Sequence, residues 1–302
     1  MLHLGVDLGG SKTAIVVIDA DGRERFAQRA PTPGGEYESA VHALAGMIRS
    51  AEREAGAPCS VGIGMPGALS PRTGLVKNAY NTAFNGRPLK ADLERELGRE
   101  VRIANDANCF ALSEAVDGAA RGAHVVFGAI LGTGAGGGIV VDRRVLEGRN
   151  AIGGEWGHNP LPWMRPDENP GPRCYCGRDG CIEQFVSGPA LARDHRAAGG
   201  EVLDSAAIVA RAAAGEAACS ASLDRYEDRL ARALAHVVNL LDPDIIVIGG
   251  GMSKTPHLYE NVPRRLLRYV YSDAVETRVV GAAHGDASGV RGAAMLWREP
   301  HG

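Results

Sequence analysis

The chain has 302 residues, of which 45% are hydrophobic and 23% charged, and its formal net charge is -3 with a pI near 6.3. This length exceeds one typical domain and predicts two lobes of a globular protein. The small negative charge gives no field that would attract nucleic acid or an anionic membrane, and no apolar run approaches the roughly 18 residues of a membrane span. No charged-then-apolar leader precedes the first strand, so we expect a cytoplasmic protein that acts on small molecules.

The chain begins with a strand, a glycine turn and a second strand. Leu4 to Leu8 and Ala14 to Ile18 are apolar, and Gly9 to Thr13 form the turn between them. Glycines let backbone N–H groups approach an anion without a Cβ in the way, so this hairpin is expected to bind phosphate. The turn comes close to a Walker A loop, but a serine interrupts its Gly-Lys pair and no helical pattern follows. We exclude that motif.

The next elements are a helix and a strand that ends near a polar loop. Glu36 to Ala55 has apolar residues at helical spacing and predicts a surface helix. Val61 to Gly67 predicts a short strand ending in a Pro-Gly turn, where Gly67 could offer a backbone N–H to a ligand hydroxyl; an ordinary loop fits equally well. The loop from Ser70 to Gly86 is rich in asparagine, whose amide suits hydroxyl groups. Asn81 is its candidate sugar contact.

A strand from Val101 to Asn105 is followed by a helical pattern that begins at Asp106. Asp106 could serve only as the helix N-cap. It could also accept a hydroxyl proton during phosphoryl transfer, since an aspartate at the end of a strand can face a ligand. The two roles are compatible.

A second glycine turn separates the apolar run Val125 to Leu131 from the β-branched run Ile139 to Val141. Three of its glycines fit a dinucleotide fingerprint, but that motif needs a helix where a second strand is expected here. A plain glycine-rich hairpin is the other alternative. Because the same design occurs roughly 120 residues earlier, we expect each lobe to offer one hairpin turn to a polyphosphate held between the lobes.

Three cysteines lie within eight positions, at Cys174, Cys176 and Cys181, and His158 precedes them in a Gly-Glu-Trp-Gly-His segment. These four donors predict a closed, structural zinc site with no position left for water. Free or disulfide-bonded cysteines are the alternative. A zinc ion here would clamp an irregular loop so that Glu155, His158 and Glu183 face the ligand.

The C-terminal third predicts helices over residues 206–218 and 223–241, and Pro243 stops the second one. A buried strand from Asp244 to Gly249 leads to Gly250 and Gly251, which could face the flat adenosine end of a nucleotide or form a simple strand-to-helix turn. Residues 259–270 predict a helix with a solvated basic face. A final helix after His284 is expected to return to the first lobe.

Six segments together resemble one family. They are D-L-G-G-S-K-T at Asp7 to Thr13, A-N-D-A-N at Ala104 to Asn108, L-G-T-G-A-G-G-G at Leu131 to Gly138, G-E-W-G-H-N-P-L-P-W at Gly154 to Trp163, C-Y-C-G-R-D-G-C-I-E at Cys174 to Glu183, and I-G-G-G-M-S at Ile248 to Ser253. The chain resembles the ROK sugar kinases over nearly its whole length. Within that family it is most similar to bacterial fructokinases of the manno(fructo)kinase type, with N-acetylglucosamine kinases next.

The resemblance implies an α/β, actin-like ATPase fold of two ribonuclease-H-like lobes, with ATP and Mg²⁺ in a cleft between them. It implies transfer of a phosphoryl group to the 6-hydroxyl of a hexose, with D-fructose expected and N-acetylglucosamine, mannose or glucose as alternatives. Asp106 would be the catalytic base, and Asp7 would hold Mg²⁺, directly or through water. The zinc ligands would be His158, Cys174, Cys176 and Cys181. The sugar contacts would be Gly67, Asn81, Asn105, Asp106, Glu155, His158 and Glu183.

The nucleotide would be held by segments of both lobes. These are Gly5, Val6, Asp7, Leu8, Gly9, Gly10, Ser11, Lys12 and Thr13, then Gly132, Thr133, Gly134, Ala135, Gly136, Gly137, Gly138 and Ile139, and finally Gly250 and Gly251. The expected lobes are residues 1–118 with 290–302, and residues 119–289. The family resemblance also suggests a homodimer.

Two other classes of protein remain as alternatives. The family includes sugar-responsive transcriptional repressors, but these carry an N-terminal helix-turn-helix, and here the first hairpin begins within a few residues of Met1. An NAD-dependent dehydrogenase rests only on the glycine fingerprint of the second turn.

Overall fold

The computed structural model describes residues 1–79 and 82–298. By its internal contacts the chain forms two compact units. The first comprises residues 1–122, 138–153 and 286–302, and the second comprises residues 123–137 and 154–285. The expected lobes placed 138–153 in the second lobe, whereas these units group that segment with the first. Among the described residues, no helix is both long and apolar enough to cross a membrane.

The first unit is built on a five-stranded sheet in the order β3-β2-β1-β4-β7. Strands β1 (Leu2–Leu8), β2 (Lys12–Ile18) and β3 (Glu24–Pro31) form an antiparallel meander. Strands β4 (Cys59–Met65) and β7 (Val101–Asn105) run parallel to β1. The expected first hairpin is therefore present, with Leu8 opposite Thr13.

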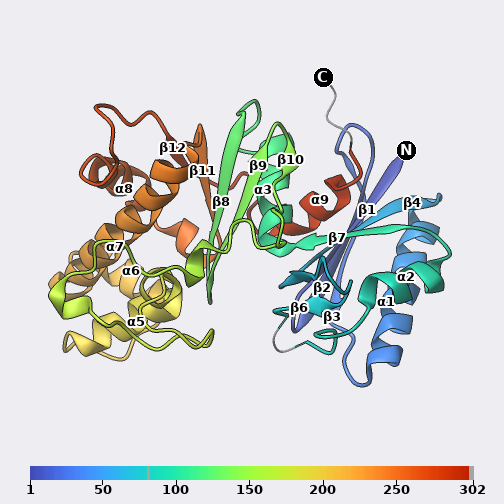
Figure 1. Cartoon of the computed structure of the whole chain (residues 1–302), viewed down its shortest axis with the longest axis horizontal. Coiled ribbons are helices and arrows are strands. Elements are labelled where there is room, and N and C mark those ends of the chain that lie inside the picture. The colour runs from blue at the N-terminus through green and yellow to red at the C-terminus, as the bar shows by residue number, and fades with distance from the viewer. Residues whose placement is uncertain (80–81, 299–302) are drawn as a thin grey trace. The chain divides into compact units, whose positions relative to one another are not determined.

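Helices cover both faces of this sheet. The helices α1 (Tyr37–Ala55) and α2 (Leu89–Leu97) lie on one side, and α9 (Ser288–Met295) lies on the other, beside α3 (Asp106–Val116) (Figure 1). The buried residues of α1 recur at helical spacing and pack against the apolar residues of β1, β2 and β4. Two short strands, β5 (Ala68–Leu69) and β6 (Val76–Lys77), pair next to the sheet's edge.

The last helix belongs to the first unit, as the sequence predicted. An added Cβ on Gly5 of β1 would lie 2.1 Å from the carbonyl oxygen of Val290, and one on Gly62 of β4 would lie 1.9 Å from that of Ala293. These two glycines let α9 approach the sheet more closely than any side chain would allow.

A second sheet has the order β10-β9-β8-β11-β12, which repeats the pattern of the first. Its strands are β8 (Val125–Leu131), β9 (Ala135–Val141), β10 (Arg144–Val145), β11 (Ile245–Gly249) and β12 (Arg278–Gly281). The strand β11 is parallel to β8 and to β12, and all five of its residues are buried. The chain passes from the second unit to the first within β9.

The helices of the second unit are α4 (Glu183–Val186), α5 (Gly188–Ala197), α6 (Ser205–Ala213), α7 (Ala217–Leu241) and α8 (Leu258–Leu266). The helix α7 packs against α4, α5, α6 and α8 (Figure 1). It ends at Leu241, one residue before the left-handed Asp242 and two before Pro243, as the proline predicted.

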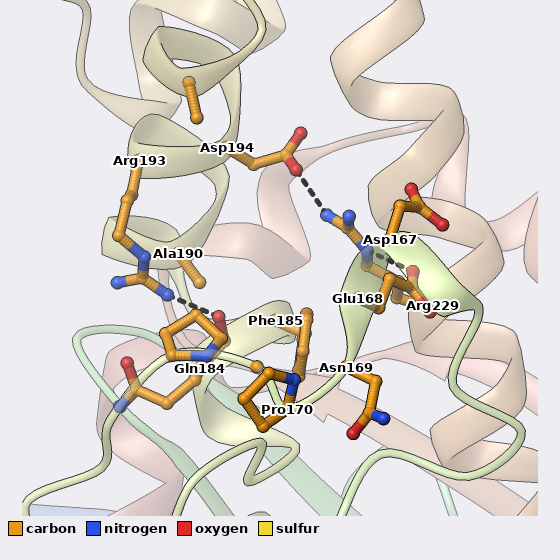
Figure 2. Close-up of a pocket in the computed structure, with 13 residues that line it drawn as sticks. Asp167, Glu168, Asn169, Pro170, Gln184, Phe185, Ala190, Arg193, Asp194 and Arg229 are labelled. Atoms are coloured by element: carbon orange, nitrogen blue, oxygen red, sulfur yellow. Dashed lines mark hydrogen bonds and ion pairs between the residues drawn. The ribbon is translucent and has the colours of Figure 1, made fainter.

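A buried ion-pair network joins α7 to the loop that precedes the cysteines. The Glu168 carboxylate accepts a bond from Arg229 at 2.8 Å, and Arg229 also donates to Asp194 at 2.7 Å (Figure 2). The same carboxylate accepts a bond from Arg232 at 2.7 Å. The two arginines hold the pKa of Glu168 at about 2 against the opposing effect of its burial. Each of these charges has a partner, which is the condition for keeping them inside a protein.

Candidate functional site

The carboxyl ends of β1, β4 and β7 meet at one edge of the first sheet. In this register Asp7 is opposite Gly64, and Gly64 is opposite Ala104, so Asp7 and the residues that follow β7 lie at the same edge. Asp106 is the first residue of α3, where the sequence placed it. The carboxyl ends of parallel strands are the usual ligand-binding edge of an open sheet.

The two aspartates at this edge occupy an environment that disfavours their charges. Burial and the nearby Asp106 carboxylate raise the pKa of Asp7 to about 6, although Arg29 opposes this. Burial also raises the pKa of Asp106, while a bond to its carboxylate from the Ala107 N–H, at 2.8 Å, opposes the shift. Two desolvated carboxylates close together suit a divalent cation, and a carboxylate with a raised pKa is a stronger base.

Asn105 holds Asp106 in place. Its side-chain oxygen accepts bonds from the N–H groups of Ala107 and Asn108, at 2.9 and 3.4 Å, so Asn105 is the N-cap of α3. The interpretation of Asp106 as the N-cap was wrong, because Asp106 is the first residue inside the helix and the N-cap is the residue before it. The amide nitrogen of Asn105 donates to the Gly67 carbonyl oxygen at 3.1 Å. These bonds position two predicted sugar contacts; contact with a sugar stays a prediction.

Gly67 needs to be glycine for two reasons. Its φ is +77°, in the left-handed region, and an added Cβ would lie 2.2 Å from the Lys77 carbonyl oxygen. The predicted contact Asn81 lies outside the described residues.

The first glycine turn is open at its tip and anchored at its base. Gly10, Ser11 and Lys12 are exposed. The Gly9 N–H donates to the Lys12 carbonyl oxygen at 3.1 Å, and the Thr32 hydroxyl donates to the Gly9 carbonyl oxygen at 2.7 Å. This arrangement leaves the tip available to an anion, as expected of a phosphate-binding hairpin.

Several residues of the predicted nucleotide segment lie in the core instead. The side chains of Val6, Leu8 and Thr13 are at most 1% exposed, and Gly5 is covered by α9. These positions hold the strands that carry the turn. Their part in nucleotide binding stays a prediction.

The second glycine turn is shorter than the sequence suggested. Only Gly132, Thr133 and Gly134 form the turn, because β9 already begins at Ala135. Gly136 and Gly137 belong to the strand, where the Trp156 indole N–H donates to the Gly136 carbonyl oxygen at 2.8 Å and a Cβ on Gly137 would lie 2.7 Å from the Trp156 ring.

The last two predicted residues of this segment lie further along β9. Gly138 and Ile139 belong to the first unit, and an added Cβ on Gly138 would lie 2.3 Å from the Ala107 carbonyl oxygen. Gly137 and Gly138 thus serve close packing in a strand.

Glu183 and the first residue of α5 fix the backbone of this turn through hydrogen bonds. The Ala135 N–H donates to the Glu183 carboxylate at 3.0 Å, and the Gly188 N–H donates to the Gly132 carbonyl oxygen at 2.8 Å. The Glu183 side chain is buried. A residue predicted only as a sugar contact therefore also fixes the backbone beside the phosphate turn.

The four predicted zinc ligands converge. Their ligand atoms all lie within 4.8 Å of one another. The Cys174 sulfur is 3.6 Å from His158 Nδ1, and the sulfurs of Cys176 and Cys181 are 3.5 Å apart. Around one tetrahedral zinc ion, with bonds of about 2.3 Å to sulfur and 2.0–2.1 Å to nitrogen, such edges measure about 3.6–3.8 Å. The cysteines are free rather than disulfide-bonded, and the donor set fits zinc.

His158 has a partner on its other nitrogen. Its Nε2 lies 3.0 Å from the hydroxyl of Tyr175, a residue between two of the cysteines that the sequence analysis overlooked. A histidine that binds metal through one nitrogen commonly fixes its ring through the other. Glu155 is exposed and directly precedes a short 3-10 helix, Trp156–His158.

Gly250 lies directly beside the second turn. Its φ is +79°, and an added Cβ would lie 2.5 Å from the carbonyl oxygen of Leu131, the residue before the turn. Gly251 begins the short 3-10 helix Gly251–Lys254 and is exposed. Gly250 and Gly251 thus form a strand-to-helix turn, and this turn is compatible with the predicted contact to adenosine.

Trp156 is the clearest functional candidate that sequence reasoning left without a role. It packs edge-on against Phe127 of β8, with ring centroids 5.4 Å apart, and bonds to Gly136 of β9. It thereby joins the Glu155–His158 segment to the two strands that flank the turn. A large aromatic residue among glycines is the signal that could have identified it.

Comparison with known proteins first defines the class: the solved structures most like this chain include sugar kinases, and the fold is the actin-like ATPase fold. A ROK hexokinase from Thermus thermophilus is 34% identical, with a TM-score of 0.86 and coverage of 98% of this chain and 97% of that one. A ROK glucokinase from Streptomyces griseus, in complex with glucose and AMPPNP, is 30% identical, with a TM-score of 0.79 and coverage of 98% and 99%.

The particular family follows from the sequence match. Residues 3–300 match the ROK family, and the chain belongs to it. An N-acetyl-D-glucosamine kinase from Pectobacterium atrosepticum is 40% identical over 299 residues, which cover 98% of each chain. The family and the fold expected from the sequence are confirmed.

Proposed function

We propose that the protein is an ATP-dependent kinase that phosphorylates the 6-hydroxyl of N-acetylglucosamine. The observation that carries the kinase proposal is the pair Asp7 and Asp106 at the carboxyl edge of a sheet whose first hairpin has an exposed glycine turn. The full-length relative with 40% identity supports N-acetylglucosamine as the sugar. Fructose, which the sequence analysis expected, is less well supported by these relatives.

In this proposal the residues of the chain bind both substrates, orient the catalytic base and deprotonate the attacking hydroxyl. Backbone N–H groups of the two glycine turns hold the phosphates, and Asp106 accepts the proton of the attacking hydroxyl. Asn105 keeps Asp106 at the start of α3 through the bonds of the N-cap. Glu155, His158 and Glu183 bind the sugar hydroxyls, and Gly250 and Gly251 face the adenosine.

Asp7 is the residue that would hold Mg²⁺. Its desolvated carboxylate near a second carboxylate fits a divalent cation, which removes the like-charge repulsion. Bound Mg²⁺ supplies charge neutralisation of the phosphates. Asp7 would orient the cation, directly or through water.

The proposal for the sugar is tested by measuring ADP release with N-acetylglucosamine, fructose, mannose, glucose and N-acetylmannosamine under identical conditions. We expect kcat/KM to be highest for N-acetylglucosamine. A higher value for fructose would restore the expectation from the sequence. No ADP release with any of the five sugars would contradict the kinase proposal itself.

We also propose that zinc occupies the Cys₃His centre and has a structural role. Metal analysis of the purified chain should give about one zinc ion per chain, because four donors converge and leave no open position. Cys176→Ser should lose the metal and unfold at a lower temperature. Cys59→Ser, which changes a cysteine of the first unit, should keep the zinc. A metal-free parent with the same unfolding temperature as the zinc-loaded one would contradict the proposal.

A further inference from the structure

A pocket of about 380 Å³ lies within the second unit, and its lining includes none of the residues predicted to bind sugar, nucleotide or zinc. It is enclosed by the loop that contains Asn169 and Pro170, by Gln184 and Phe185 of α4, by Arg193 of α5 and by Arg229 of α7 (Figure 2). A volume of this size is within the range of pockets that hold small organic ligands.

One cation on this pocket is the exposed guanidinium of Arg193. Arg193 donates to the Gln184 carbonyl oxygen and makes no ion pair with any described residue. The neighbouring Asp194 already pairs with Arg225 and Arg229, each at 2.7 Å. Burial lowers the pKa of Arg193, the charge of Asp194 opposes this shift, and the charge of Arg229 adds to it. A guanidinium in this situation favours an anionic ligand that can accept two parallel bonds.

The rest of the lining suits a compact ligand with hydroxyl groups. Phe185 and Pro170 supply apolar surface, and the Arg229 guanidinium lies 5.4 Å from the centroid of the Phe185 ring. Asn169 and Gln184 supply side-chain amides, which both donate and accept. Apolar surface beneath amide groups is complementary to a sugar ring, which has an apolar face and a rim of hydroxyls.

We propose that this pocket is a second ligand site that binds a monosaccharide phosphate, with the phosphate on Arg193 and the sugar between Phe185 and the two amides. The identity of the sugar rests on the proposed function, whose product is such a molecule. The site lies on α4, the helix whose first residue, Glu183, bonds to the Ala135 N–H beside the phosphate turn. An occupant would therefore contact the element that holds that turn.

The number of binding sites per chain tests the proposal. The parent and Arg193→Gln are titrated calorimetrically with N-acetylglucosamine 6-phosphate, and separately with inorganic phosphate and with N-acetylglucosamine. We expect Arg193→Gln to have one site fewer for the sugar phosphate than the parent. Inorganic phosphate should bind this site at least about tenfold more weakly than the sugar phosphate, because it lacks the ring contacts. The unphosphorylated sugar should not distinguish the two proteins.

Two further variants make the outcome decisive. Ala197→Phe places a large side chain on the pocket wall from the last turn of α5 and should also remove one site, without changing any charge. Arg196→Gln removes an exposed arginine of the same helix that does not line the pocket, and it should keep the parent's number of sites. Equal numbers of sites in the parent, Arg193→Gln and Ala197→Phe would overturn the proposal.

The experiment separates this proposal from the proposed function. Turnover of N-acetylglucosamine is measured on the same preparations, and neither Arg193 nor Ala197 belongs to the proposed catalytic machinery. A parent that binds the sugar phosphate at the Arg193 site but releases no ADP would contradict only the kinase proposal. Equally tight binding of inorganic phosphate and sugar phosphate would overturn the assignment of a sugar ligand.

Discussion

The carboxylates of the two units differ in how the protein treats their charge. In the first unit, Asp7 is half-buried near another carboxylate, and its pKa is raised to about 6. In the second unit, Glu168 is buried between two arginines, and its pKa is lowered to about 2. Burial disfavours the charge in both places, so the sign of the neighbouring charges decides the outcome.

This difference separates a functional arrangement from a structural one. The network around Glu168 satisfies each charge within the unit, and removing one partner leaves the others buried and unpaired. The pair Asp7 and Asp106 is strained by its own repulsion and gains most from a cation or a proton brought by a ligand. Substitutions should therefore have opposite effects on stability in the two regions.

The largest effect is expected for Asp106→Asn. The change keeps the shape of the side chain but removes the proposed base, so kcat should fall by about 10³-fold, within the 10²- to 10⁴-fold range of general-base catalysis. The measurement is ADP release at saturating sugar and nucleotide. The unfolding temperature should not fall, because the variant removes a charge that burial disfavours.

Asn108→Ala provides the matched control on the same helix turn. Asn108 is buried and is not a predicted ligand contact, so its loss should affect stability more than turnover. An Asp106→Asn enzyme that keeps a tenth or more of the parent's kcat would rule Asp106 out as the base and would remove the functional side of the comparison.

The position of Asp106 could be predicted from the sequence because it depends on local signals. An apolar strand that stops at Asn105 and a helical pattern that starts one residue later fix where the side chain emerges. The two glycine hairpins and the cysteine cluster could be predicted for the same reason, since the residues that define each of them lie close together in the sequence. The sequence could not show that Asn105 rather than Asp106 is the N-cap, because both residue types suit that position.

The second largest effect is expected for Glu168→Gln. The amide cannot balance Arg229 and Arg232, so the free energy of unfolding should fall by about 3 kcal/mol at neutral pH. Denaturant titration measures this. Because the pKa of Glu168 is lowered from 4.5 to about 2, its stabilising contribution is present above pH 4.5 and is lost as the pH falls toward 2. The difference between parent and variant should therefore shrink over that interval.

Asp167→Asn is the control for this variant, because Asp167 is exposed and makes no bond to the two arginines. Its stability should match the parent within about 0.5 kcal/mol. A Glu168→Gln protein as stable as the parent would show that the network does not depend on this carboxylate.

The network itself could not have been predicted from the sequence. Glu168 lies in a proline-rich loop, and its two arginine partners are more than sixty positions away on the helix α7. The same limit explains Glu183, whose bond to Ala135 spans 48 positions. Long-range pairing depends on how the elements pack, and the local sequence pattern of one element does not indicate it.

The length of the second glycine turn was predicted wrongly for a different reason. Glycines that allow close packing in a strand cannot be distinguished in the sequence from glycines of a loop.

The smallest effect, and the one of opposite sign, is expected for Asp7→Asn. The pKa of Asp7 is raised from 3.8 to about 6, so the folded state disfavours the ionised carboxylate. The parent therefore bears no such cost below pH 3.8, an increasing cost as the pH rises to about 6, and a constant one above it. Denaturant titration at pH 7 in the absence of Mg²⁺ should find Asp7→Asn more stable than the parent by on the order of 2 kcal/mol, and the gain should vanish near pH 4.

Mg²⁺ with nucleotide should stabilise the parent but not the variant, because the variant lacks the carboxylate that orients the cation. If Asp7→Asn instead lowers stability at pH 7, Asp7 behaves like Glu168, and the two regions do not differ in the way their charges are held.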